Sequence, residues 1–137
     1  MASLKVERTI NASIGKVWSV LSEFGKAPGP SIQITLVKEG DPEGYGVGCE
    51  RIVKLGGNEV HERIEEVDPP ESFSYVILSG APVKHYLGTV ELFEKDGVTE
   101  INWSGEFVPK LPGTAWIIER ESKKVINAFI DELDKIE

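Results

Sequence analysis

The sequence of 137 residues contains one cysteine, two histidines and no long apolar run. The single thiol, Cys49, excludes an internal disulfide and a multi-thiolate zinc site, and His61 and His85 are the only further imidazole ligands. We therefore expect neither a metal site nor a cofactor. No run approaches the ~20 apolar residues of a membrane helix, and residues 1–5 lack a signal-peptide pattern. These features predict a cytoplasmic protein without membrane insertion.

Basic residues are in the minority, with 15 Lys and Arg against 23 Asp and Glu, which gives a net charge of -8. A nucleic acid or an anionic membrane would be repelled unless basic residues were concentrated locally, and the sequence shows no such cluster. We expect no nucleic-acid partner. The chain length predicts one domain over residues 1–137 and leaves the oligomeric state open, a homodimer included.

Two helices are predicted from apolar periodicity. The longer runs from Pro112 to Glu137, and a shorter one runs from a cap at Asn11 or Ser13 to about Phe24. The apolar stripe of the long helix recurs at three- and four-residue steps and contains Ile118, Ser122, Val125, Phe129, Leu133 and Ile136. Such a stripe needs a broad apolar partner, and a curved sheet would provide one.

Alternating apolar residues predict about six to seven strands, joined by links short enough for antiparallel neighbours. The first strand is Leu4 to Ile10. In the second, within Ser31 to Glu39, the side chains of Ile32, Ile34 and Leu36 share a face. The order of strand, helix, about six strands and helix indicates an α+β fold.

Two short turns predict the strand register. Gly56-Gly57 would place Arg51 opposite Glu62, a pair of opposite charges on an apolar face. Asp96-Gly97 would place four pairs on one face, namely Leu92 with Ile101, Val90 with Trp103, Gly88 with Gly105, and Tyr86 with Phe107. The facing glycines Gly88 and Gly105 have two interpretations, a gap that holds a ligand or a sharp bend of the sheet, and glycine more often has the second role.

The order of several segments resembles the SRPBCC superfamily, most closely its polyketide cyclase/dehydrase branch. The resemblance runs nearly end to end and rests on Val17–Phe24, Gly46–Arg51, Glu62–Ile64 with Val67-Asp68, Ala81–Val83 with Tyr86, and Ile101–Trp103. It implies a helix-grip fold, in which a curved antiparallel sheet wraps around a long C-terminal helix, with two short helices near the start. Members include lipid carriers, aromatase/cyclases and hormone receptors, so the fold alone does not fix a function.

The plant abscisic acid receptors are a more distant relative with a similar Gly-Cys-x-Arg segment. This likeness implies that a set of side chains faces the cavity, namely Arg51, Glu62, Tyr86, Gly88, Trp103, Gly105 and Phe107. Two departures argue against hormone reception. The second strand has no lysine before Lys38 to bind a ligand carboxylate, and Gly56-Gly57-Asn58 replaces a longer, proline-containing gate loop.

Arg51 and Glu62 are the leading site candidates, because a carboxylate on an apolar face needs a partner or a raised pKa. They would orient the polar end of a ligand, or Glu62 would act as a general base, or the two form only a structural ion pair. Tyr75 and Tyr86 could donate to a ligand carbonyl. The remaining ligand-binding candidates are Gly88, Trp103, Gly105, Phe107, Val125 and Phe129, for which packing in the core is the plain alternative.

Three functions remain open. The first is binding of a small hydrophobic or aromatic molecule between the sheet and the C-terminal helix. The second is a cyclase, dehydratase or aromatase in which Glu62 is the acid/base and Arg51 and Tyr86 position the substrate. The third is an interaction domain with a filled interior. A cavity of roughly 300 Å³ or more would favour ligand binding, whereas a filled interior would favour the third function.

Overall fold

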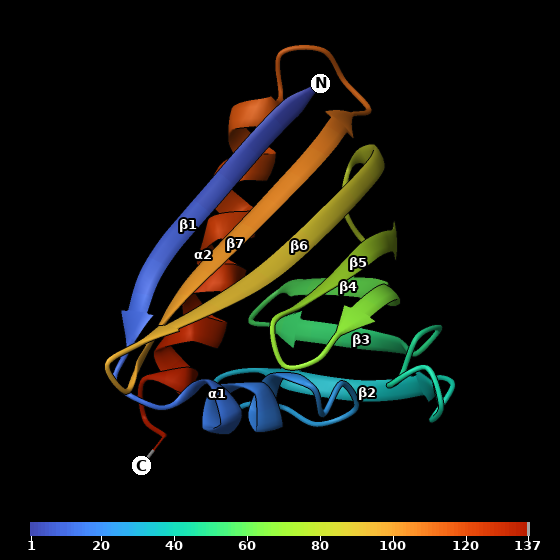
Figure 1. The fold of residues 1–137 in the computed structure, drawn as a ribbon. Coiled ribbons are helices and arrows are strands. Elements are labelled where there is room, and N and C mark those ends of the chain that lie inside the picture. Colours follow the sequence, from blue (N-terminus) through green and yellow to red (C-terminus); the bar gives the residue numbers. More distant parts are fainter. Residues whose placement is uncertain (137) are drawn as a thin grey trace.

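The computed structural model describes residues 1–136 and contains seven strands and two helices within them (Figure 1). In chain order they are β1 (Ala2–Ile10), α1 (Ile14–Leu21), β2 (Gln33–Lys38), β3 (Glu50–Leu55), β4 (Asn58–Asp68), β5 (Ser72–Ser79), β6 (Val83–Lys95), β7 (Val98–Pro109) and α2 (Ala115–Leu133). The strands form one antiparallel sheet in the order β1-β7-β6-β5-β4-β3-β2. The sheet curves strongly, and α2 lies against the inner face of its β1 and β7 part (Figure 1). This is the α+β helix-grip arrangement expected from the sequence.

Both predicted turns set the register as expected. Arg51 lies opposite Glu62 across β3 and β4, and Gly88 lies opposite Gly105 across β6 and β7. The turn between β6 and β7 has positive φ at both Asp96 (54°) and Gly97 (82°), the backbone of a type I′ turn. Because side chains alternate along a strand, each register fixes which residues face α2.

The helix boundaries differ from the sequence prediction. α1 begins after Ser13, whose hydroxyl accepts from the Lys16 backbone N–H at 3.4 Å, and it ends at Leu21 rather than near Phe24. Turns rather than a second short helix follow it, within the described residues. α2 begins at Ala115, beyond Pro112 and Gly113, and Gly113 has a φ of 81° that does not fit a helix.

Two groups of polar contacts hold the C-terminal half of α2 in place. Arg8 on β1 donates to Asp131 at 2.7 Å and to Asp134 at 2.6 Å. Glu132 is buried and accepts from the Ser31 hydroxyl at 3.1 Å, which ties the loop before β2 to the helix. Toward the opposite end of α2, Glu121 accepts from Nδ2 of Asn58 at 3.5 Å, a longer contact than those of Arg8.

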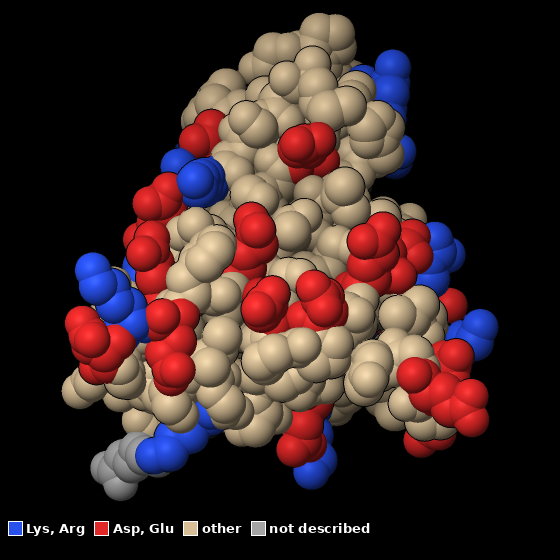
Figure 2. Space-filling view, viewed as in Figure 1, with Lys and Arg blue, Asp and Glu red and all other residues tan. Residues whose placement is uncertain are grey.

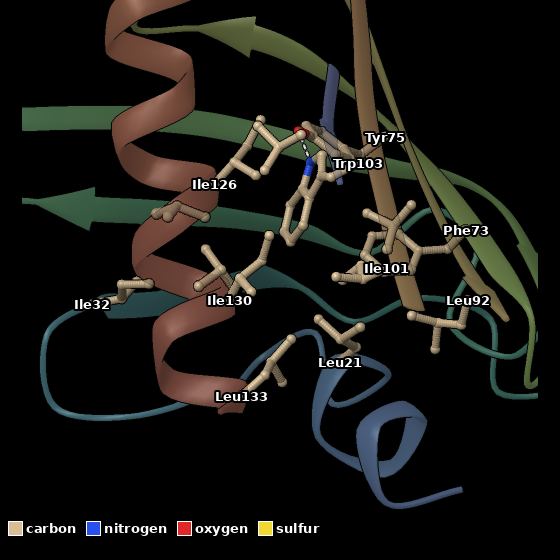
Figure 3. Packing of buried hydrophobic residues seen from close by; sticks show 14 of the residues in the cluster. Leu21, Ile32, Phe73, Tyr75, Leu92, Ile101, Trp103, Ile126, Ile130 and Leu133 are labelled. Carbon is tan, nitrogen blue, oxygen red and sulfur yellow. Dashed lines mark hydrogen bonds between the residues drawn. The ribbon is translucent and has the colours of Figure 1, made fainter. Parts of the chain in front are cut away.

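The core fills the space between α1, the lower half of α2 and the sheet (Figure 3). Ile130 and Leu133 of α2 are fully buried there, and Ile101 of β7 is also fully buried. The indole of Trp103 is tilted against the ring of Phe129, with 5.4 Å between centroids.

Leu36, which the sequence places on one face with Ile32 and Ile34, is 43% exposed. It does share a face with Ile34, as predicted, since the two lie opposite Arg51 and Val53. However, β2 is the edge strand, and α2 packs against the other side of the sheet, next to β1 and β7. Ile32, which precedes β2, is buried.

Candidate functional site

A cavity of about 210 Å³ lies between the first half of α2 and the inner face of β3 to β7. The sheet contributes Val53, Asn58, Val60, Glu62, Tyr75, Ile77, Tyr86 and Trp103, the link between β5 and β6 contributes Gly80–Pro82, and α2 contributes Ile117, Ile118, Glu121, Ser122, Val125 and Ile126. The cavity is therefore mostly apolar, with a few polar groups. This volume is smaller than the roughly 300 Å³ that we took as the criterion for ligand binding. The interior is nevertheless not filled by side chains.

Glu62 and Arg51 form a buried ion pair beside the cavity. The Nε of Arg51 donates to Oε1 of Glu62 at 3.2 Å, and the two side chains are 3% and 10% exposed. Burial raises the pKa of Glu62 above its ordinary range, and the Arg51 guanidinium opposes part of that rise. No described residue donates to Oε2, the second carboxylate oxygen, so this oxygen is free to accept from a ligand.

Arg51 itself is enclosed by protein. Its guanidinium lies between two rings, 5.8 Å from the centroid of Phe24 and 5.7 Å from that of Phe129. Its Nη1 also donates to the backbone carbonyl of Phe24 at 3.2 Å. Arg51 therefore holds Glu62 in position and joins the end of α1 to the sheet, and it does not line the cavity.

Two tyrosines form the aromatic wall of the cavity. The Tyr75 hydroxyl accepts from Nε1 of Trp103 at 2.9 Å (Figure 3). Burial raises the pKa of Tyr75 well above its usual range. Burial also raises the pKa of Tyr86, against the effect of the Ser122 and Tyr75 side chains beside it. Both phenols therefore stay protonated at neutral pH and can act as hydrogen-bond donors.

The structure brings half of the predicted site residues to the cavity. Glu62, Tyr75, Tyr86, Trp103 and Val125 line it, whereas Arg51, Gly88, Gly105, Phe107 and Phe129 lie behind these or in the packed core. All ten are on the inner side of the sheet or on the inward stripe of α2, as their spacing predicted. Spacing alone did not identify Asn58, Glu121 or the segment from Gly80 to Pro82, because they reach the cavity from the start of β4, from the edge of the helix stripe and from the link between β5 and β6.

The lining of the cavity includes a second carboxylate. Glu121 accepts from Nδ2 of Asn58 at 3.5 Å, and Arg120 and Lys124 are its charged neighbours, at 3.3 and 3.5 Å. The contact with Asn58 links α2 to the start of β4. No lysine, arginine or histidine is among the cavity-lining residues in the described part of the chain.

The remaining candidates stay outside the site. Cys49 is buried, and this burial raises the pKa of its thiol, so it behaves as a small apolar side chain. Within residues 1–136, no group of three or more His, Cys, Asp and Glu residues is placed to hold a metal ion, and neither helix has the length and apolarity to cross a membrane.

Comparison with known proteins gives a family and several structures of the same fold. The family described as polyketide cyclase/dehydrase and lipid transport matches residues 1–135. MLP-like protein 423 of Arabidopsis thaliana is 38% identical over 96 residues, which are 67% of this chain and 53% of that protein. This chain therefore spans about half the length of that relative.

Two solved structures show how far the likeness in fold extends. XoxI from Bacillus cereus superposes with a TM-score of 0.78 at 22% identity, covering 98% of this chain and 94% of the other. Norcoclaurine synthase from Thalictrum flavum, in complex with dopamine and hydroxybenzaldehyde, has a TM-score of 0.76 at 20% identity and covers 98% and 84%. At these identities the likeness establishes the fold alone.

Proposed function

We propose that this chain, which belongs to the polyketide cyclase/dehydrase and lipid transport family, binds a small, largely apolar or aromatic molecule in the cavity between the sheet and α2. The observation that carries the proposal is a buried carboxylate, Glu62, with one oxygen bound to Arg51 and the other free at an apolar cavity. Apolar walls with a few well-placed polar groups are typical of small-molecule sites.

The cavity volume limits the size of the ligand. An apolar cavity of about 150 Å³ holds one benzene molecule, so 210 Å³ suits a single ring with a short substituent or two small fused rings. A long acyl chain or a four-ring polyketide would not fit. The Thalictrum flavum enzyme of the same fold is described with dopamine and hydroxybenzaldehyde, both one-ring molecules, which is consistent with this limit.

The polar groups limit the ligand chemistry. A ligand hydroxyl or amine can donate to Oε2 of Glu62, and a ligand carbonyl can accept from a tyrosine hydroxyl. A ligand carboxylate would instead meet Glu62 and Glu121 with no cation lining the cavity to compensate it. We therefore infer that the ligand is an alcohol, a phenol or an amine and not a carboxylic acid.

Three probes of equal length test this chemistry, namely phenylpropanol, phenylpropylamine and phenylpropionate. Binding is followed by the fluorescence of Trp103, which lines the cavity, and by calorimetry. The alcohol and the amine should bind at least tenfold more tightly than the carboxylate, since one lost charge-assisted hydrogen bond costs more than 1.4 kcal/mol. Tighter binding of the carboxylate would contradict the proposed ligand class.

A cavity-filling variant tests the location. Val125→Trp should abolish binding of all three probes, because Val125 lines the cavity and an indole would occupy most of it. The matched control is Val37→Trp, at an exposed position of the edge strand β2, which should bind like the wild type. Binding that survives Val125→Trp would place the ligand elsewhere. Native mass spectrometry of protein purified from its own host would then identify the natural ligand.

The raised pKa of Glu62 favours a second candidate function. A carboxylate whose pKa is raised by burial is a stronger base than an ordinary carboxylate, which favours proton removal from a substrate. In that case Tyr86 would hold the carbonyl of the substrate while Glu62 removes a proton. Glu62→Gln should then abolish turnover with nearly unchanged affinity, because glutamine keeps a hydrogen-bond acceptor. Unchanged turnover in this variant would exclude the enzymatic role.

A further inference from the structure

One end of the molecule lacks acidic residues, although the chain as a whole is acidic. Residues 79–90 and 107–118 contain no Asp or Glu, and their lysines, Lys84 and Lys110, are both exposed. The two segments are neighbours in space: Val83 pairs with Pro109, and the Lys110 backbone N–H donates to the Pro82 carbonyl at 3.0 Å. The sequence did not show this cluster, because the lysines are far apart along the chain.

Exposed apolar side chains lie beside these lysines. Leu111 is 65% exposed and Trp116 is 61% exposed, in the loop before α2 and at the first turn of the helix. The Thr114 hydroxyl donates to the Leu111 carbonyl at 2.6 Å, and the Arg120 guanidinium lies 5.3 Å from the centre of the Trp116 ring. Figure 2 shows the uppermost part of this face as uncharged, with basic residues at its right edge, and acidic side chains begin just below it and are most numerous over the middle and lower parts.

Four acidic residues border this end, and two of them have cations as partners. On α2, Glu119 pairs with Lys123 at 2.9 Å, and Glu121 has Arg120 and Lys124 beside it. On β7, Glu106 alternates with inward-facing Gly105 and Phe107, so it lies on the outer face of the sheet. Glu59, whose carbonyl packs against Gly80, is exposed and lies opposite Lys54 on β3. Cations outnumber carboxylates around this end, with Lys54, Lys84, Lys110, Arg120, Lys123 and Lys124 against Glu59, Glu106, Glu119 and Glu121, so the net charge there is weakly positive.

We propose that this surface, formed by Leu111 and Trp116 with Lys84, Lys110 and Arg120 around them, docks onto a lipid bilayer that contains anionic lipids. Tryptophan is favoured at the boundary between headgroups and acyl chains, where its ring is half apolar and half hydrated. Basic side chains at the same depth are attracted to anionic headgroups. The negative charge on the rest of the molecule orients it, because only this end can approach an anionic surface.

Docking in this orientation would place one end of the cavity against the bilayer. Gly80, Ala81 and Pro82 and the first turn of α2, at Ile117, line the cavity and belong to the same two segments as the docking surface. A small apolar ligand dissolved in the membrane could then enter the cavity without crossing water. The docking surface and the binding site would work together, although docking itself requires no ligand.

The test uses the full chain with vesicles of phosphatidylcholine, either alone or mixed with phosphatidylserine. We expect sedimentation with the mixed vesicles only, weaker at high salt, and a blue shift of the tryptophan emission. Trp116→Phe should remove that shift, since Trp103 is already buried. Lys84→Gln with Lys110→Gln should weaken binding about 25-fold, at roughly fivefold for each cation near the surface.

The matched control changes two lysines away from this end. Lys26 follows α1, and Lys95 precedes the turn between β6 and β7, at the opposite end of the long strands; both are exposed (Figure 1). Lys26→Gln with Lys95→Gln should leave vesicle binding within about twofold of the wild type, because these cations lie beyond a Debye length from the bilayer. Three results would overturn the proposal: no binding to either vesicle, equal binding to both, or equal losses in the two double variants. Self-association that needs Trp116 in the absence of vesicles would assign the surface to a second copy of the chain instead. None of these results depends on the ligand of the cavity.

Discussion

The ring of Tyr75 occupies the space above Gly88 on the neighbouring strand, so that a Cβ at position 88 would overlap the phenol ring. Gly105 is covered in the same way, since a Cβ there would lie 2.5 Å from the Tyr86 hydroxyl oxygen. The two tyrosine rings stack, with 6.3 Å between their centroids. The glycine pair therefore makes room for the aromatic wall of the cavity and adds no volume to the cavity itself.

Gly88→Ala should destabilise the fold by about 1–3 kcal/mol, because the Tyr75 ring is buried and has to move. Urea denaturation measures this loss. Gly15→Ala in α1 is the matched control, since no atom lies within 4 Å of its added Cβ. That variant should gain about 0.5–1 kcal/mol, as alanine replaces glycine within a helix. A Gly88→Ala protein as stable as the wild type would show that the ring is not fixed above the glycine.

Arg51→Met should cost about 3–5 kcal/mol of stability, because it leaves the Glu62 carboxylate buried without its partner. The double variant Arg51→Met with Glu62→Met should recover part of this loss, since it removes the unpaired charge as well. A double-mutant cycle by urea denaturation measures the coupling between the two residues. Additive losses would mean that the pair contributes no coupling.

The difference in stability between Glu62→Gln and the wild type should depend on pH. The folded protein keeps a proton on Glu62 to a higher pH than the unfolded chain, because the folded pKa is raised. The contribution of Glu62 to stability is therefore complete below about pH 4 and is lost as pH rises through the folded pKa. Glutamine does not titrate, so the stability of Glu62→Gln does not fall in this way. The variant should therefore become more stable relative to the wild type as pH rises from about 4 through the folded pKa of Glu62. A change of opposite sign would mean that Arg51 outweighs burial and lowers the pKa.

Tyr75→Phe should lower stability by about 1–3 kcal/mol, since Nε1 of buried Trp103 loses its acceptor. Tyr86→Phe removes a hydroxyl that does not bond to Trp103 and should cost less. Thermal unfolding of the two variants gives the comparison. Equal losses would show that the bond between Trp103 and Tyr75 is not the cause.

The sequence predicted strand register well and the extent of the cavity poorly, for a physical reason. Turns such as Asp96-Gly97 act locally, so the pairing of Gly88 with Gly105 follows from the residues between them. Whether an inward side chain meets a void or another side chain depends on how the sheet curves and where α2 crosses it. Phe107 and Phe129 face inward as predicted, yet packing encloses them. For Gly88 and Gly105 the sequence left open whether they make a gap for a ligand or a bend of the sheet. The space above Gly88 is in fact occupied by the ring of Tyr75, which comes from the adjacent strand β5.

The pairing of β1 with β7 affects the order in which the fold can assemble. Ile10 lies beside Thr99, so about 90 residues must be synthesised and brought into place before the first strand gains a neighbour. The pairs from β2 to β7 join segments close in the chain and can form early, whereas the β1 pairing carries a large entropic cost of loop closure. Until it forms, the edge of β7 is exposed to other chains. Chains that stall at this stage during synthesis are the form of this protein most prone to aggregate.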